Sequence, residues 1–300
     1  MNLGIKGVIV PLLTPFDGRG ALDPGAIRRL VDFLIDRGVR GLMPAGTTGE
    51  MPLLTSEERR QLAKTVVEAA AGRVPVLVHT GSASTRETLE LTWHAQAIGA
   101  DAAVIVPPYY YRYDDEALFC HFAHVAEQVP DFPIYLYENP AVTGNTITLS
   151  AIRRLVDCCA NIVGLKDSSG SLATLTACRR LRDGTFNAAG GADGLILAGA
   201  AMGIDACVSG NANFVPELVV ALHAAATQGD LPRARELQAT LDAVRAILGD
   251  GADLSRFKGM LAKRGLPVGD VRAPLLQASE DMIASCWQTL TALDLELVPV

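Results

Sequence analysis

The sequence has few of the features that mark secreted, membrane-bound or nucleic-acid-binding proteins. Its six cysteines include no CxxC pair and no repeated spacing, so a disulfide framework is not expected. No apolar run reaches the roughly 18 residues of a membrane helix, and the first residues do not resemble a signal peptide. The net charge of −7, without a lysine or arginine cluster, argues against nucleic acid or an anionic membrane as a partner. We therefore expect a reduced, cytoplasmic protein.

Nucleotide-binding loops and metal clusters are also missing. The segment after the first predicted strand, PLLTPF at residues 11–16, matches neither GxGxxG nor the Walker A pattern. His121 and His124 lie three residues apart in a helical segment, but no carboxylate cluster accompanies them. This arrangement favours a pair of surface histidines over metal ligands.

Short apolar runs rich in valine and isoleucine alternate with longer segments of helical period. The apolar runs predict eight strands, at residues 7–12, 41–45, 74–80, 102–107, 133–138, 162–166, 186–190 and 206–210. The periodic segments predict helices at residues 24–37, 56–71, 84–98, 114–129, 150–160, 171–182 and 192–202.

This alternation predicts an α/β protein with a parallel sheet, since parallel strands that helices cover on both faces are apolar throughout. An open doubly wound sheet and a closed barrel both fit the pattern. The count of eight strands and the missing phosphate loop favour a (β/α)8 TIM barrel. Near residue 224 the alternation ends, and helices are expected at 231–248, 254–263 and 279–293. We predict a barrel domain with the active site over residues 1–223 and a C-terminal helical domain over residues 224–300.

Lys166 ends the apolar run of the sixth predicted strand. In a TIM barrel the active site lies at the carboxyl ends of the strands. Burial there would disfavour the ammonium form and supply the free amine that a nucleophile needs. The position also allows a lysine that reaches water or pairs with Asp167.

Other strand ends carry residues that could assist such an amine. Tyr137 ends the fifth strand, where it would be either a proton-transferring phenol or an ordinary core tyrosine. The Gly46-Thr47-Thr48-Gly turn after the second strand could present amides and hydroxyls to a carboxylate, or be a plain turn. The three tyrosines at 109–111 fit a lid, a subunit contact or a stacking surface.

Five motifs in order resemble the dihydrodipicolinate synthase and N-acetylneuraminate lyase superfamily of pyruvate-dependent aldolases. They are GTTGE at 46–50, PPYYY at 107–111, YENPAVTG at 137–144, GLKDSSG at 164–170, and a C-terminal segment from Lys258 to Leu275. The resemblance covers nearly the whole chain. It implies a Schiff-base enzyme on a TIM barrel, with no metal or organic cofactor.

The resemblance also implies a role for each catalytic residue. Lys166 would form an imine with the keto carbon of pyruvate, and Tyr137 would move the protons. Thr47 would link the hydroxyl of Tyr137 to that of Tyr110, which a neighbouring subunit would supply. The resemblance implies such a neighbour, because members of the superfamily are commonly homotetramers built as dimers of dimers.

The pyruvate site follows from the same resemblance. Thr48 and the turn that starts at Gly46 would hold the carboxylate, and Gly191 and Val208 would place backbone carbonyls near the lysine. Hydroxyls of the second half of the substrate could be bound by Asp193, Ser168, Ser169, Glu138 and Asn139.

Departures from the superfamily pattern narrow the range of molecules that could form this second half of the substrate. Dihydrodipicolinate synthases carry an arginine in the segment after the tyrosine, where this chain has Val142, which cannot pair with a carboxylate. Neuraminate lyases carry a second carboxylate where this chain has Gly194, and a serine where it has Gly210.

We therefore expect a lyase or aldolase that cleaves or forms a 2-keto-3-deoxy sugar acid or a hydroxy-2-oxo acid, with a hydro-lyase reaction also open. Dihydrodipicolinate synthase itself, condensing pyruvate with aspartate semialdehyde, is the alternative enzyme. A non-catalytic keto-acid binding protein is the alternative outside catalysis.

Overall fold

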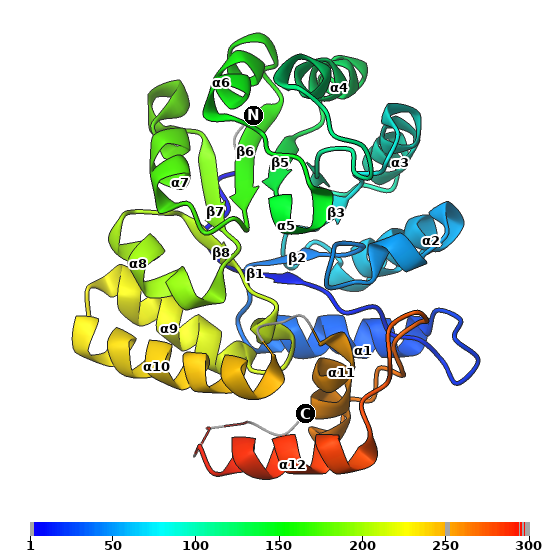
Figure 1. The fold of residues 1–300 in the computed structure, drawn as a ribbon, viewed down its shortest axis with the longest axis vertical. Coiled ribbons are helices and arrows are strands. Elements are labelled where there is room, and N and C mark those ends of the chain that lie inside the picture. The colour runs from blue at the N-terminus through cyan, green and yellow to red at the C-terminus, as the bar shows by residue number, and fades with distance from the viewer. Residues whose placement is uncertain (1–2, 250–252, 294, 296, 298–300) are drawn as a thin grey trace.

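The computed structural model describes residues 3–249, 253–293, 295 and 297. Strands occupy the centre of the molecule, and helices surround them (Figure 1). The strands are β1 Gly7–Pro11, β2 Gly41–Met43, β3 Leu77–His79, β4 Ala102–Ile105, β5 Ile134–Glu138, β6 Ile162–Asp167, β7 Asn187–Gly190 and β8 Ala206–Val208. The α-helices of the barrel region are α1 Pro24–Asp36, α2 Ser56–Ala70, α3 Thr85–Ala97, α4 Asp115–Gln128, α5 Pro140–Thr143, α6 Leu149–Cys158, α7 Leu172–Arg179, α8 Ile196–Ala201 and α9 Pro216–Gln228.

The eight strands form one parallel sheet in the order β2-β1-β8-β7-β6-β5-β4-β3. A parallel bridge between Leu42 and Val76 joins β2 to the start of β3 and closes the ring. The predicted (β/α)8 TIM barrel is therefore confirmed. Its carboxyl-terminal end gathers the loops after all eight strands at one mouth.

Apolar side chains fill the inside of the barrel, and they include Ile9, Met43, Tyr135, Val163 and Val208. A second and larger cluster lies between the outer faces of the strands and the helices. The pairing of β5 with β6 shifts register at Ile134 and Tyr135. At this shift a Cβ on Gly164 would lie 2.3 Å from the Tyr135 ring, so only glycine lets the tyrosine fill the barrel there.

The C-terminal helices are α10 Leu231–Leu248, α11 Leu254–Lys263 and α12 Glu280–Thr291. In Figure 1, α10 lies along α9, and α12 lies beside α11 at the edge of the barrel. The predicted domain boundary at residue 224 falls inside α9, and the division into two domains stays a prediction. Among the described residues, no helix combines the length and apolar character needed to cross a bilayer.

Several elements differ from the prediction. Helix α9 was not predicted, because apolar and alanine residues occupy most of its sides and leave little helical contrast in the sequence. Strand β3 is shorter than the predicted 74–80. The predicted helix at 171–182 ends at Arg179 and continues as a 3-10 turn, Leu181–Gly184, in which Arg182 and Asp183 have positive φ.

Candidate active site

Lys166 is the penultimate residue of β6, and its side chain points into the barrel. Only 4% of the residue is exposed. Its Nζ lies 3.8 Å from the centre of the Tyr137 ring and donates to Met43 Sδ at 3.7 Å. Asp167, the next residue of the strand, points to the opposite face, and its carboxylate accepts from the Ser169 amide. The amine therefore faces the barrel mouth and not its sequence neighbour.

Tyr137 on β5 lies beside Lys166 in the sheet register. Its hydroxyl accepts a hydrogen bond of 2.9 Å from Asn139 Nδ2. Burial raises the pKa of Tyr137, but the charge of Lys166 and hydrogen bonds with Thr47, Ser168 and Lys166 outweigh burial and bring the pKa below its usual range. A phenol with a lowered pKa releases its proton more readily, which suits general acid–base chemistry.

The turn after β2 shapes the next part of the site. The amides of Gly49 and Met51 donate to the Gly46 carbonyl, and the amide of Glu50 donates to the Thr47 carbonyl. In the described chain no backbone carbonyl accepts from the amides of Thr47 and Thr48. Thr47 is exposed and Thr48 is half-buried. The turn thus offers two amides and two hydroxyls beside Tyr137.

Strands β7 and β8 complete the ring around the lysine. The amide of Gly191 donates to the Asp167 carbonyl at 2.7 Å, and a Cβ on Gly191 would lie 2.2 Å from Ser168 Oγ, so the close approach requires glycine. Val208 ends β8 and is buried inside the barrel. A Cβ added to Gly210 would lie 3.9 Å from Thr48 Oγ1, so the segment after β8 lies beside the turn after β2. Strands that are far apart in the sequence therefore enclose one site.

Asp193 is already engaged by the protein. Its carboxylate accepts from the backbone amide of Asn211 at 3.2 Å and from the Asn211 side chain. Burial raises the pKa of Asp193, against hydrogen bonds from Asn211 and Ser209 that lower it. At the next residue, a Cβ on Gly194 would lie 2.5 Å from the guanidinium of Arg245, which reaches over from α10. An arginine thus occupies the space beside Gly194.

Tyr110 does not belong to this buried group within one chain. It is 87% exposed, has a φ of +85°, and contacts the ring of Tyr111 edge to face. The predicted contribution of Tyr110 from a neighbouring subunit stays a prediction. A left-handed backbone at a bulky residue is strained. Such strain is common at functional positions, and it fits a Tyr110 side chain that points outward to contact another subunit.

A cavity of about 330 Å³ opens next to Thr47. Its lining is mostly apolar and includes Met51, Tyr109, Val142 and Leu275. Val142 on α5 is 56% exposed, so its side chain is available to a molecule in this space. No charged side chain other than that of Glu50 lines the cavity among the described residues.

Met43 and His79 also contact the catalytic pair, and neither was predicted from the sequence. The His79 ring packs edge to face on Tyr137, with 6.0 Å between ring centres. Burial, followed by the charges of Arg59 and Lys166, holds the pKa of His79 well below its usual range, so the ring is neutral. His79 ends an apolar run as Lys166 does, and this shared pattern was the available signal.

The expectation of a surface histidine pair is wrong for His121. This residue is 5% exposed, and its Nδ1 shares a hydrogen bond of 2.9 Å with Thr85 Oγ1, whereas His124 is exposed. The two histidines are neighbours on α4, but only His121 is turned far enough toward the core to be buried. Among the described residues there is no group of three or more histidine, cysteine or acidic side chains that could hold a metal ion.

Comparison with known proteins places these features in a family. The sequence model of the dihydrodipicolinate synthetase family matches residues 4–293. A DapA-like lyase of Halobacterium salinarum is 38% identical over 98% of this chain and 95% of the relative. The 4-hydroxy-tetrahydrodipicolinate synthase of Bartonella quintana is 35% identical over 92% of this chain and 94% of the relative.

Solved structures agree with the sequence relatives. Dihydrodipicolinate synthase from Aquifex aeolicus superimposes with a TM-score of 0.90 at 34% identity, covering 97% of this chain and 99% of that one. YagE, a prophage protein of the dihydrodipicolinic acid synthase family from E. coli K12 in complex with pyruvate, gives the same TM-score, identity and coverage. The predicted resemblance and the predicted class of enzyme are confirmed. The chain belongs to the dihydrodipicolinate synthetase family of class I, pyruvate-dependent lyases and aldolases.

Proposed function

We propose that the protein reversibly cleaves a hydroxy-2-oxo acid to pyruvate and an aldehyde through an imine on Lys166. The Nζ of Lys166 attacks the keto carbon, and water leaves as the imine forms. The protonated imine accepts the electron pair of the breaking C3–C4 bond, so the aldehyde departs and an enamine remains. Protonation at C3 and hydrolysis then release pyruvate and the free amine. The amine facing the Tyr137 ring at 3.8 Å supports this proposal above all.

The neighbouring groups suit the remaining steps. Tyr137, with its lowered pKa, would move protons to and from the carbinolamine and the aldehyde oxygen. The amides of Thr47 and Thr48 and the Thr48 hydroxyl would bind the carboxylate of pyruvate, because amide and hydroxyl donors bind anionic oxygens well. The carbonyls of Gly191 and Val208 would face the imine.

The cavity beside Thr47 suggests the nature of the aldehyde. Val142 and the other apolar residues of its lining would favour an aldehyde with an apolar end, because burying a carboxylate without a partner is costly. The Asp193 carboxylate already accepts hydrogen bonds from the amide and the side chain of Asn211. Ser168 remains beside the Tyr137 hydroxyl as a candidate ligand for a substrate hydroxyl. A 2-keto-3-deoxy sugar acid is the second candidate, bound through Ser168.

A homotetramer built as a dimer of dimers would complete the site. Tyr110, Tyr111 and Leu276 are exposed apolar residues, and such groups often lie in subunit contacts. Tyr110 of the partner subunit would then join Thr47 and Tyr137 in a hydroxyl relay. A cytoplasmic location is consistent with six cysteines that are all unpaired.

Two alternatives remain open to experiment. Several relatives are named 4-hydroxy-tetrahydrodipicolinate synthase, so condensation of pyruvate with aspartate semialdehyde is the alternative reaction. It would require another cation to replace the arginine missing at Val142. A non-catalytic keto-acid binding protein would show stabilisation by keto acids without turnover.

Borohydride trapping tests the mechanism, and an aldehyde panel tests the substrate. Incubation with pyruvate and borohydride should add a reduced pyruvyl group to Lys166, detected by peptide mass spectrometry. The absence of an adduct would contradict the mechanism. Pyruvate should then condense faster with aldehydes that have apolar ends than with aspartate semialdehyde, and the reverse order would favour the synthase.

A further inference from the structure

A buried ion pair joins the C-terminal helices to the turn that follows β2. Lys258 on α11 places its Nζ 2.7 Å from Glu50 Oε1, and both side chains are completely buried. The same Nζ donates to the Asp270 carbonyl at 2.8 Å and lies 4.3 Å from the centre of the Phe16 ring. Ion pairs excluded from water are unusual, because each charge loses its hydration. The catalytic steps described above use neither residue.

Glu50 is the last residue of the Gly46–Glu50 turn, and its backbone is left-handed, with φ of +58° and ψ of +31°. A residue with a side chain keeps this conformation only where its surroundings hold it. Two contacts hold Glu50 from the C-terminal side. Lys258 contacts one carboxylate oxygen, and the backbone amide of Arg272 donates to the other at 2.8 Å.

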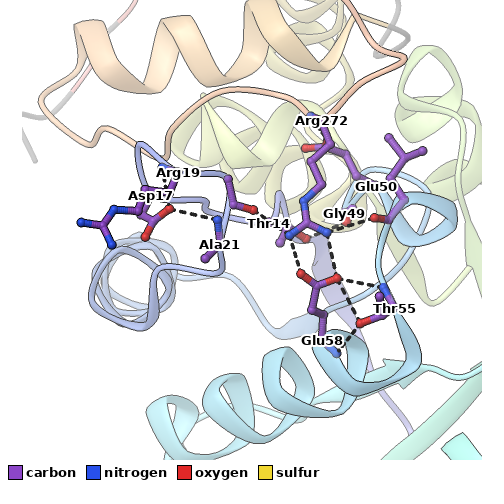
Figure 2. A network of polar contacts seen from close by, with 11 residues as sticks. Thr14, Asp17, Arg19, Ala21, Gly49, Glu50, Thr55, Glu58 and Arg272 are labelled. Atoms are coloured by element: carbon purple, nitrogen blue, oxygen red, sulfur yellow. Dashed lines mark hydrogen bonds and ion pairs between the residues drawn. The ribbon is translucent and has the colours of Figure 1, made fainter.

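Arg272 is itself fixed to the barrel (Figure 2). Its guanidinium donates to both carboxylate oxygens of Glu58 on α2, to the Leu53 carbonyl at 3.0 Å and to the Gly20 carbonyl at 2.7 Å. The Arg272 side chain pulls the pKa of Glu58 down to about 2. The anchor of Glu50 is therefore attached to α2 and to the loop before α1.

The opposite side of the turn is also clamped. Thr14 Oγ1 donates to the Gly49 carbonyl at 2.6 Å, and Thr14 is completely buried. A Cβ on Gly49 would lie 3.0 Å from the Leu12 carbonyl oxygen, so this side of the turn packs closely against the segment after β1. The freedom left to the turn lies at Glu50, where the C-terminal segment holds it.

We propose that Glu50 and Lys258 are positioning residues for the 2-keto acid, and that they act by fixing the amides of Thr47 and Thr48. The C-terminal region thereby contributes to substrate binding through the turn after β2. This inference rests on the proposed function. Glu50→Gln would keep one acceptor for the Arg272 amide but lose the charged contact to Lys258, and the two threonine amides would lose their alignment.

The test compares two carbonyl compounds that differ in the carboxylate. Pyruvate needs the turn, whereas acetone can form an imine with Lys166 without it. In E50Q, the pyruvate concentration for half-maximal borohydride trapping should rise about tenfold, the loss expected when hydrogen bonds to a charged group weaken. The rate of trapping with acetone should stay within about twofold of the unsubstituted protein, because the amine and Tyr137 are unchanged.

Two further variants separate positioning from stability. Glu50→Gln leaves Lys258 buried without its counter-charge, so the double variant E50Q/K258M, which buries no charge at this point, is measured beside it. The double variant should melt at a higher temperature than E50Q but keep the raised half-saturating pyruvate concentration. Glu217→Gln is the matched control, since Glu217 on α9 pairs with Arg37 at the end of α1 and with Arg264 at the end of α11. It should lower the melting temperature and leave both trapping reactions unchanged.

Three outcomes would overturn the inference. Equal losses with pyruvate and acetone in E50Q would mean a general structural defect. Unchanged pyruvate trapping, or full recovery of it in E50Q/K258M, would mean that the pair acts on stability alone. No pyruvate adduct in the unsubstituted protein, with acetone trapped normally, would overturn the proposed function and this inference with it.

Discussion

Two pairs of residues at the ends of β5 and β6 have equal burial and opposite surroundings. Tyr137 and Lys166 face the inside of the barrel, while Glu138 and Asp167, the next residues of the same strands, face outward toward the helices. All four are between 1% and 4% exposed. Burial alone therefore cannot explain why one pair suits catalysis and the other does not.

The charge of the nearest neighbour makes the difference. Inside the barrel, burial raises the pKa of Tyr137, but the positive charge of Lys166 and the hydrogen bonds around the phenol together lower it. Outside, burial raises the pKa of Glu138 to about 7, and the negative charge of Asp167 adds to the rise. Each outer carboxyl also has one oxygen without a hydrogen-bond partner in the described chain. The lowered pKa of Tyr137 favours release of its proton, whereas the raised pKa values of Glu138 and Asp167 favour their protonated forms.

Replacing Lys166 should have the largest effect. Lys166→Met removes the nucleophile and keeps the volume, so turnover and the borohydride adduct should both fall below detection. Intact mass spectrometry after trapping with pyruvate makes the measurement. Lys263→Met, at an exposed lysine of α11, is the control and should keep the adduct on Lys166.

Replacing Tyr137 should have the next largest effect. Tyr137→Phe removes the proton donor and keeps the ring over Lys166, so kcat should fall by roughly 10²- to 10⁴-fold while trapping persists. Tyr135→Phe is the matched control inside the barrel, because it loses a hydrogen bond of 2.9 Å to Asn187. This control should cost about 1 kcal/mol of unfolding free energy and keep kcat. Equal losses of kcat in both variants would contradict the assigned role of Tyr137.

Glu138 of the outer pair should make the free energy of unfolding depend on pH. Glu138 holds its proton up to about pH 7 in the folded protein, whereas in the unfolded chain it loses the proton near pH 4.3. The folded state binds more protons between these values, so the free energy of unfolding should fall as pH rises from about 4.5 to about 7, by on the order of 2 kcal/mol.

Glu138→Gln should remove this part of the pH dependence in urea unfolding at pH 5 and pH 8. Asp157→Asn, at an exposed carboxyl of α6, should leave the pH dependence unchanged. A variant E138Q that loses stability with pH as steeply as the unsubstituted protein would show that another group is responsible.

The smallest effect is expected at Ser169, which contacts Asp167 of the outer pair. Its hydroxyl and its amide both lower the pKa of Asp167, against burial, which raises it. Ser169→Ala should cost less than about 1 kcal/mol of stability, measured by thermal unfolding, and should leave pyruvate trapping on Lys166 unchanged. A change in trapping would mean that the outer pair acts on the inner one.

Residues at strand ends could be predicted from the sequence, whereas the residues that contact them across the fold could not. Lys166, Tyr137 and the turn after β2 could be predicted, since each interrupts or ends an apolar run and the barrel brings such ends together. His79 had the same pattern, but nothing in the sequence placed its ring on Tyr137. The contact of Arg245 with Gly194 and the pairing of Lys258 with Glu50 join distant segments, and hydrophobic periodicity carries no information on such contacts.

The register shift between β5 and β6 decides which side of the barrel wall is reactive. Val163 points inside, and strict alternation along β6 would send Leu165 inside with it and turn Lys166 toward the helices. Val163 is the additional residue, because the register passes from the Ile134–Ile162 pair directly to the Tyr135–Gly164 pair. It reverses the alternation, so that Lys166 points inside and Leu165 packs outward. One additional residue in a strand therefore decides whether the nucleophile faces the buried layer of helices or the mouth of the barrel.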